Sequence, residues 1–225
     1  IALDLDTGKL KWHFQFTPHD VHDWDATEVP VLIDAEFRGT PRKLLLFPNR
    51  NAFYYVLDRT NGQFLLGKSF VKTNWYTGFD EKGRPLRAPG IEPTKAGTLV
   101  YPGNQGGTNW YNPSFSPATG LFYVPTWENS SSTYVKGEEP PEFHDGASFT
   151  GLFPKSGNNS EDQFSAIAAI DPKTGAKTIN QESVPHIGKT TVNCPADPGG
   201  RGWPATAYSP KTKTLYLPMN EYCSD

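Results

Sequence analysis

The sequence predicts an all-β fold, and its internal repeats favour a β-propeller over other all-β architectures. Glycine and proline each occur 21 times in 225 residues, and aromatic residues make up 13% of the chain. Turn formers at this density, between short aromatic and β-branched runs, are typical of sandwiches, barrels and propellers. No long stretch carries apolar residues at helical spacing, so we expect strands throughout.

A short strand–turn–strand repeat is the strongest architectural signal. It occurs at residues 1–12, 55–62 and 168–175, and each copy ends a strand with an aspartate and places a glycine in the turn. In the first copy these residues are Asp4 and Gly8. The carboxylate can accept backbone N–H groups of the turn, and the glycine supplies a positive φ.

A second, larger repeat relates residues 106–117 to residues 199–210 and continues in register to Glu128 and Glu221. The separation of the two copies would hold about two blades at typical propeller repeat lengths. Radial repetition of small antiparallel sheets is typical of a propeller.

Two polar stretches interrupt these units. Residues 79–95 and 130–163 are rich in Gly, Pro, Asn, Ser and charge, and we expect surface loops or insertions there.

Cys194 and Cys223 are the only cysteines and bracket one strand–turn–strand unit. A disulfide formed in an oxidising compartment and two unpaired thiols both remain open.

Charge and hydropathy exclude several classes of partner. The net charge is −3 and no run is rich in Lys or Arg, which argues against binding to nucleic acid or anionic membrane surfaces. The longest apolar runs, residues 44–47 and 166–170, are far too short to cross a bilayer. We therefore do not expect an integral membrane protein.

The chain opens at Ile1 inside an apparent strand, without a signal peptide, and stops at Asp225 directly after a strand-like run. We interpret residues 1–225 as a partial propeller domain whose upstream and downstream blades are missing.

The segment from Thr17 to Ala26 is the richest in reactive side chains. Two histidines and three aspartates crowd into seven of its residues: His19, Asp20, His22, Asp23 and Asp25. Imidazole and carboxylate both ligate divalent ions, so this could be a metal site, or it could be a solvated loop with hydrogen-bonded turns. If the chain runs extended here, Asp23 and Asp25 share one face and repel unless a cation joins them or one is protonated.

Thr-Pro-His-Asp followed by Asp-aromatic-Asp resembles the active-site segment of methanol and ethanol dehydrogenases that depend on pyrroloquinoline quinone (PQQ). The resemblance implies an eight-bladed β-propeller, with roughly half of its blades in this chain. Asp23 matches the catalytic aspartate, which is a base toward the alcohol and a metal ligand. Asp25 matches the extra metal-binding aspartate of the lanthanide-using branch, and an added anionic oxygen favours a more highly charged cation. The family usually has an acidic residue and Trp where this chain has Val21 and His22.

Two further segments extend the resemblance over nearly the whole chain. The apolar run from Leu44 predicts a buried strand. Arg50 follows that run and a Pro-Asn turn. It resembles the basic residue of the family that forms hydrogen bonds with the reactive oxygens of the quinone. A fixed positive charge there stabilises the negative charge that develops on those oxygens. In the Gly-Gly-Thr-Asn-Trp segment, Asn109 and Trp110 match residues that contact the cofactor by polar bonds and by packing. Trp12 resembles the tryptophan docking motif of these propellers.

The resemblance implies oxidation of a primary alcohol to an aldehyde, with PQQ and a Ca²⁺ or lanthanide ion as cofactors and a cytochrome c as electron acceptor. It also implies a periplasmic or secreted protein. The family's remaining metal ligands lie upstream of the catalytic aspartate, so we expect residues 1–225 alone to bind PQQ weakly and to be inactive.

Two other functions remain open. One is a non-catalytic propeller scaffold of the outer-membrane assembly type, which needs neither the Asp-Trp-Asp segment nor Arg50. The other is a hydrolase with a zinc centre built from His19, His22 and Asp23, which would bind its metal without a quinone. With a Ca²⁺ or lanthanide ion we do not expect either histidine to be a ligand, because hard cations do not favour imidazole. The lack of a dinucleotide-type glycine loop argues against a nicotinamide enzyme.

Overall fold

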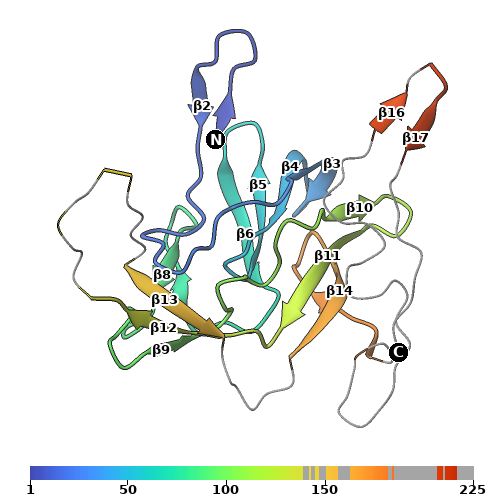
Figure 1. The fold of residues 1–225 in the computed structure, drawn as a ribbon. Helices are drawn as coiled ribbons and strands as arrows, with labels where there is room; N and C mark the ends of the chain where they lie inside the picture. The colour runs from blue at the N-terminus through green and yellow to red at the C-terminus, as the bar shows by residue number, and fades with distance from the viewer. Residues whose placement is uncertain are drawn as a thin grey trace. The chain divides into compact units, whose positions relative to one another are not determined.

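The chain is built from short antiparallel strands (Figure 1). The computed structural model describes residues 1–138, 142, 145–146, 151–156, 163–181, 184, 207–209 and 211–216. These residues contain no α-helix, and so none that is long and apolar enough to cross a membrane. The chain divides into two compact units, residues 1–179 and residues 180–225. The predicted all-β fold is confirmed.

The first complete blade is a four-stranded meander in residues 31–69 of the first unit. Its strands pair in chain order: β3 (Val31–Phe37), β4 (Thr40–Pro48), β5 (Phe53–Asp58) and β6 (Gln63–Ser69). Because strand side chains alternate between faces, Leu46 and Tyr54 enter one core cluster while Phe47 and Phe53 enter another. Burial on both faces explains the continuous apolar run from Leu44, which was predicted to be a buried strand.

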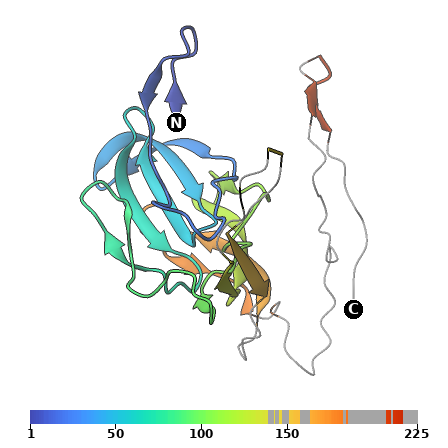
Figure 2. The ribbon, with the colours of Figure 1, turned by 60° about the vertical axis from the view of Figure 1, so that its left-hand side comes forward.

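A second four-stranded sheet packs on the first (Figure 2). Its order is β10 (Ser114–Ser116), β11 (Leu121–Glu128), β14 (Phe164–Ile170) and β15 (Lys177–Thr178). The face-to-face contact is apolar, with the rings of Tyr54 and Phe122 centred 5.2 Å apart and Ile170 fully buried in the same cluster. This burial of apolar area is the main force that holds the two blades together.

The stretch between β11 and β14 is an insertion, as predicted, but it is not only loop. It contributes β12 (Ser132–Lys136) and β13 (Leu152–Ser156), which form a three-stranded sheet with β9 (Thr98–Val100). Tyr134 on β12 is fully buried, which explains how a stretch that is mostly polar still forms strands.

The prediction of a loop at residues 79–95 is partly wrong. β7 (Tyr76–Phe79) and β8 (Pro85–Arg87) form a hairpin there. The Asp80 carboxylate stabilises the turn, because it accepts the N–H groups of Lys82 and Arg84, both at 2.8 Å. A turn aspartate of this kind makes a polar sequence compatible with a tight hairpin.

The turns of the strand–turn–strand repeat form as predicted. Asp4 lies between β1 (Ala2–Leu3) and β2 (Leu10–Trp12), and its Oδ1 accepts the N–H of Thr7 at 3.0 Å. Asp58 bonds the N–H of Thr60 in the same way at 3.0 Å, and Asp171 bonds that of Thr174 at 3.0 Å. The turn glycines have φ values between 68° and 75°.

Trp12 docks on the turn of the next repeat. Its indole Nε1 donates to the carbonyl oxygen of Arg59 at 3.2 Å, and its ring lies directly against Gly62. A Cβ atom at position 62 would lie 2.6 Å from a carbon of the Trp12 ring. The repeat thus joins consecutive blades through one tryptophan and one glycine.

We expect Gly62→Ala to destabilise the complete protein by about 2–4 kcal/mol, since it adds a left-handed Cβ penalty to a clash with Trp12. Gly8→Ala is the matched control, because Gly8 has the same turn position with φ +68°, and a Cβ atom added there would meet no other atom within 4 Å. That variant should lose only about 1–2 kcal/mol. Urea unfolding measures both, and equal losses would contradict the docking role of Trp12.

In the second unit, β16 (Ala207–Ser209) and β17 (Thr214–Tyr216) form a hairpin that repeats the first two strands of the second blade. Ala207 pairs with Tyr216 as Ser114 pairs with Tyr123, so the described hairpins of the two copies have the same register. Of the residues between the copies, those that the structure describes form most of one four-stranded sheet and the β12–β13 hairpin, and the separation of about two blades stays a prediction. Residues 199–203, Cys194 and Cys223 lie outside the described residues.

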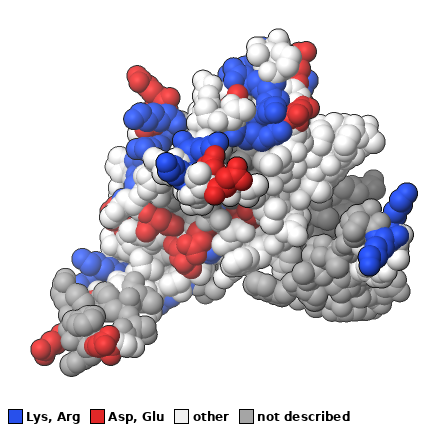
Figure 3. All heavy atoms as spheres, turned by 90° about the horizontal axis from the view of Figure 1, so that it is seen from above, with Lys and Arg blue, Asp and Glu red and all other residues white. Residues whose placement is uncertain are grey.

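The described residues show no large surface of one charge on the face seen in Figure 3, where acidic and basic side chains are interspersed. This distribution agrees with the near balance of 21 basic and 24 acidic residues.

Candidate active site

Hydrogen bonds join the three predicted active-site segments in the first unit. Asn51, in the turn after β4, donates from Nδ2 to the Thr17 hydroxyl at 3.1 Å. The buried Trp24 donates from Nε1 to the carbonyl oxygen of Gly103 at 2.9 Å. Segments that lie far apart in the sequence therefore meet in the fold.

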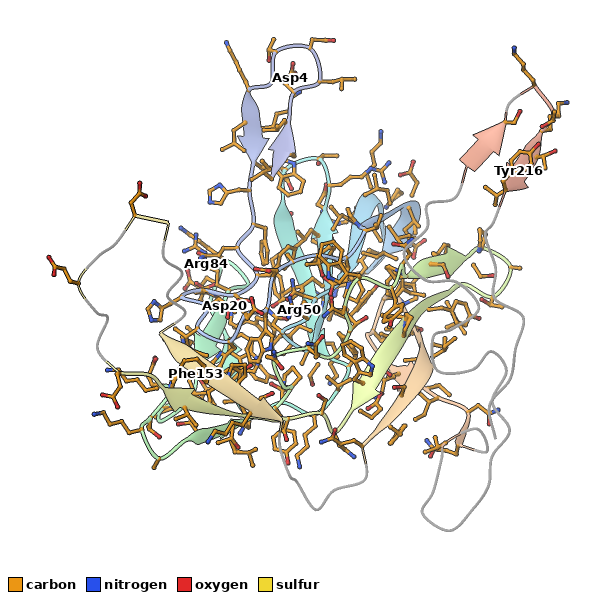
Figure 4. The ribbon with its side chains drawn as sticks, viewed as in Figure 1. Asp4, Asp20, Arg50, Arg84, Phe153 and Tyr216 are labelled. Atoms are coloured by element: carbon orange, nitrogen blue, oxygen red, sulfur yellow. The ribbon has the colours of Figure 1, made fainter. Side chains whose placement is uncertain are left out.

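Arg50 is held inside the fold by the loop that precedes β10 (Figure 4). Only 6% of the residue is exposed. Its Nη2 donates to the carbonyl oxygen of Asn104, and its own carbonyl accepts the N–H of Gly107 at 2.9 Å. A Cβ at Gly106 would lie 2.7 Å from the Cβ of Arg50, so only glycine lets the loop approach this closely.

Asp23 and Asp25 converge on the guanidinium of Arg50. The Oδ2 atom of Asp23 lies 3.8 Å from Nη2, and the Oδ2 atom of Asp25 lies 3.8 Å from Nη1. These distances are too long for hydrogen bonds, so the contacts are ionic. The Asp23 and Asp25 side chains are 69% and 72% exposed, whereas that of Arg50 is 7% exposed. The carboxylates are thus accessible in front of a buried cation.

The backbone is not extended at this point, yet both carboxylates reach the same guanidinium. Asp23 has a φ of +66°, and residues 17–30 form no strand. Aspartate tolerates the left-handed region better than most residues because its short side chain bonds locally. The loop therefore turns at Asp23 and still brings the side chains of Asp23 and Asp25 to the same guanidinium.

Asp20 fixes the shape of this loop, a role that the sequence analysis did not assign. Its Oδ1 accepts the N–H of His22 at 2.8 Å, and its Oδ2 accepts that of Trp24 at 2.7 Å. Asp20 lies on the connection between β2 and β3 (Figure 4). An aspartate two residues before a bend is a recognisable turn signal, and that signal could have identified it.

His22 is a buried packing residue. It is 2% exposed, and its ring lies 4.4 Å from that of Trp24 and 4.8 Å from that of Tyr134. Burial lowers the pKa of His22 to about 4, so the ring is neutral at neutral pH. His22 therefore fills an aromatic position, which gives a structural reason for the departure from the family's usual Trp.

A zinc centre built from His19, His22 and Asp23 is not supported. Within the part of the chain that the structure describes, no group of three or more His, Cys, Asp or Glu side chains is arranged to hold a metal ion. The described residues thus offer a pair of carboxylates, which is a partial ligand shell.

The pKa of Asp23 is raised from its ordinary value. Partial burial is the largest cause, the positive charge of Arg50 acts in the opposite direction, and the negative charges of Asp25 and Asp20 add to the increase. A carboxylate with a raised pKa is a stronger base than a free one.

The other two predicted cofactor residues lie on the loop that covers Arg50. Asn109 is 5% exposed, and its Nδ2 donates to the carbonyl oxygen of Gln105 at 3.0 Å. Its Oδ1 accepts the N–H of Trp110 at 2.9 Å. Trp110 is 57% exposed, which is unusual for so large an apolar ring and leaves area for a ligand to cover.

Glu28 is a further residue that the sequence analysis missed. It lies between Asp25 and β3, is 4% exposed, and has a pKa that burial raises to about 8. No sequence pattern marks a single glutamate in a loop as buried.

Comparison with known proteins agrees with this arrangement. Residues 1–69 match the family model for the β-propeller domain of glucose, ethanol and alcohol dehydrogenases, designated PQQ. The chain is 45% identical over 128 residues to the quinohemoprotein alcohol dehydrogenase of Comamonas testosteroni, covering 56% of this chain and 18% of that protein. It is 38% identical over 183 residues to the quinoprotein alcohol dehydrogenase PedH of Pseudomonas putida, covering 78% of this chain and 30% of that protein.

Solved structures give the same result. The crystal structure of the Comamonas testosteroni enzyme superposes with a TM-score of 0.69 at 32% identity, covering 79% of this chain and 28% of that one. A europium-containing methanol dehydrogenase superposes with a TM-score of 0.67 at 33% identity, covering 78% of this chain and 31% of that one. The chain spans less than a third of the length of these relatives.

The blades, the docked tryptophan and the covered arginine define part of a quinoprotein-type β-propeller. The chain is similar to a part of the propeller of PQQ-dependent alcohol dehydrogenases.

Proposed function

We propose that the complete protein oxidises a primary alcohol to an aldehyde, with PQQ and a Ca²⁺ or lanthanide ion as cofactors. The observation that carries this proposal is the convergence of two accessible carboxylates, Asp23 and Asp25, on the buried guanidinium of Arg50. A propeller that serves only as a scaffold has no need of such a cluster. Relatives that are named alcohol dehydrogenases support the same reaction class.

The chemistry of the donor set fits a hard cation. Two carboxylates oppose one guanidinium, so the cluster carries a net negative charge when both are ionised. Ca²⁺ and similar ions take six to eight oxygen ligands, and carboxylate oxygens are preferred. Asp23 and Asp25 would supply part of that shell. A europium ion in a structural relative is consistent with a lanthanide in this site.

Each residue has a distinct role in the proposed reaction. The bound cofactor and its cation supply the two-electron redox chemistry and the Lewis acid. Asp23 accepts the proton of the alcohol hydroxyl. Arg50, which the Asn104 carbonyl and the glycine loop hold in place, stabilises negative charge that develops on the ligand oxygens. Asn109 and Trp110 contact the cofactor from the loop above Arg50.

A cytochrome c is the proposed electron acceptor, and the periplasm is the proposed location. A relative in Thauera butanivorans that is 44% identical over 126 residues, covering 56% of this chain and 18% of that protein, is named 1-butanol dehydrogenase (cytochrome c). Both proposals concern the complete protein.

The experiment that tests this function is reconstitution of the complete protein with PQQ and either Ca²⁺ or La³⁺, followed by an ethanol-dependent dye-reduction assay. We expect activity with both components and none when either is omitted. Asp25→Ala should reduce lanthanum-supported activity at least about tenfold more than calcium-supported activity, because it removes an anionic ligand. Glu36→Gln, at an exposed position on β3, is the control. Equal losses with both ions would overturn the role of Asp25, and inactivity under all conditions would overturn the function.

A further inference from the structure

Glu28 is a buried carboxyl beside the candidate site to which the proposed reaction gives no role. It is 4% exposed, and neither of its oxygens has a hydrogen-bond partner among the described residues. The backbone N–H groups of Glu28 and Thr27 lower the pKa of the Glu28 carboxyl, but neither of them forms a full hydrogen bond with it. An unpaired buried carboxyl is costly in free energy, so the position calls for an explanation.

The charged group that acts on Glu28 is Arg50. Burial is the largest influence on Glu28 and raises its pKa to about 8, while the positive charge of Arg50 partly opposes that increase. The guanidinium Nε is itself buried and has no hydrogen-bond partner within the described residues. At neutral pH Glu28 therefore carries a proton and adds no negative charge to those of Asp23 and Asp25, which face the Arg50 guanidinium.

Two carboxylates already face the Arg50 guanidinium. Asp23 and Asp25 lie 3.8 Å from its terminal nitrogens, and Asp20 acts on Asp23 from the same loop. From β12, Tyr134 is influenced by Asp20, Asp23 and Arg50, and burial raises its pKa far above neutral. Ionisation of Glu28 would therefore add a third carboxylate to a guanidinium that already faces two.

We propose that Glu28 is a positioning residue of this site, and that its carboxyl controls how strongly Arg50 attracts anionic oxygens bound beside Asp23 and Asp25. Protonated Glu28 adds nothing to the two carboxylates, Asp23 and Asp25, that already oppose the charge of Arg50. Ionised Glu28 adds a third negative charge that weakens the attraction of Arg50 for an anionic ligand, and because Glu28 is buried this effect is little screened. This inference rests on the proposed function, since the anionic ligand is PQQ.

The test is the pH dependence of PQQ binding by the complete protein, measured by quenching of tryptophan fluorescence with saturating Ca²⁺. Affinities are compared at about pH 7 and about pH 9.5, on either side of the pKa of Glu28. In the wild type we expect the dissociation constant to rise about tenfold between the two, equivalent to about 1.4 kcal/mol. In Glu28→Gln the ratio should be close to one, and the control Glu36→Gln should behave like the wild type.

A second readout needs no ligand. Infrared difference spectra of the apo-protein between the same pH values should show the loss of a protonated carboxyl band in the wild type and no such loss in Glu28→Gln. If the wild type binds PQQ but Glu28→Gln keeps the tenfold ratio, or if the band is absent at neutral pH, the role of Glu28 is wrong and the proposed function stands. If the wild type binds no PQQ at either pH, both are wrong.

Discussion

Replacement of Asp23 by asparagine is expected to lower kcat/KM for alcohol oxidation by about 10²–10⁴-fold in the complete, PQQ-loaded protein. The substitution removes the proton acceptor and keeps the size of the side chain. Asparagine also adopts the left-handed conformation that Asp23 holds at φ +66°. Because the side chain is 69% exposed, the fold should be unaffected. Asp23→Ala would confound the result by adding backbone strain at this φ.

The pH profile distinguishes a base from a merely structural residue. The pKa of Asp23 is raised, so wild-type kcat/KM should fall as the pH drops through that pKa and protonates the base. The residual activity of Asp23→Asn should lack this acid limb. Circular dichroism and urea unfolding of the variant serve as folding controls. Activity within a few-fold of the wild type, with the acid limb unchanged, would remove Asp23 from the mechanism.

The second large effect is expected at Arg50. Arg50→Met should lower kcat/KM by about 10²–10³-fold, as the loss of one preorganised donor to developing charge typically does. Methionine is unbranched and flexible, so it can occupy the buried space beneath Gly106 with little disturbance of the loop. The loss therefore reports on charge more than on packing.

Arg50→Met should also change two binding constants in opposite directions. Without the guanidinium, Asp23 and Asp25 lose their counter-charge, so the apo-protein should bind a trivalent cation more tightly. Binding of the anionic quinone should weaken. Calorimetric titrations with La³⁺ and fluorescence titrations with PQQ measure the two effects. If both affinities fall together, the variant has disturbed the fold and the electrostatic interpretation of Arg50 fails.

Much of the fold could be predicted because it depends on local patterns. The turns at Asp4, Asp58 and Asp171 follow from an aspartate and a glycine at fixed spacing, and each forms as expected. The hairpin at residues 76–87 and the strands inserted between β11 and β14 were not predicted. Their sequences are polar and rich in turn formers, and they are strands because a few side chains such as Tyr134 are buried against distant segments.

The site was predictable to the extent that its residues form recognisable motifs. Asp23, Asp25 and Arg50 were singled out from the resemblance, and the structure brings their charged groups together. Glu28 and Asn51 could not be found in this way. Their importance comes from burial and from contacts between segments, and neither property is written in the local sequence.

The most direct test is anomalous diffraction from crystals of the complete protein with PQQ and a lanthanide ion. We predict one cation bound by carboxylate oxygens of both Asp23 and Asp25 at about 2.3–2.6 Å, with the Arg50 guanidinium within hydrogen-bond distance of the quinone. A cation bound elsewhere, or a quinone out of reach of Arg50, would contradict the proposal that these three side chains form one catalytic site.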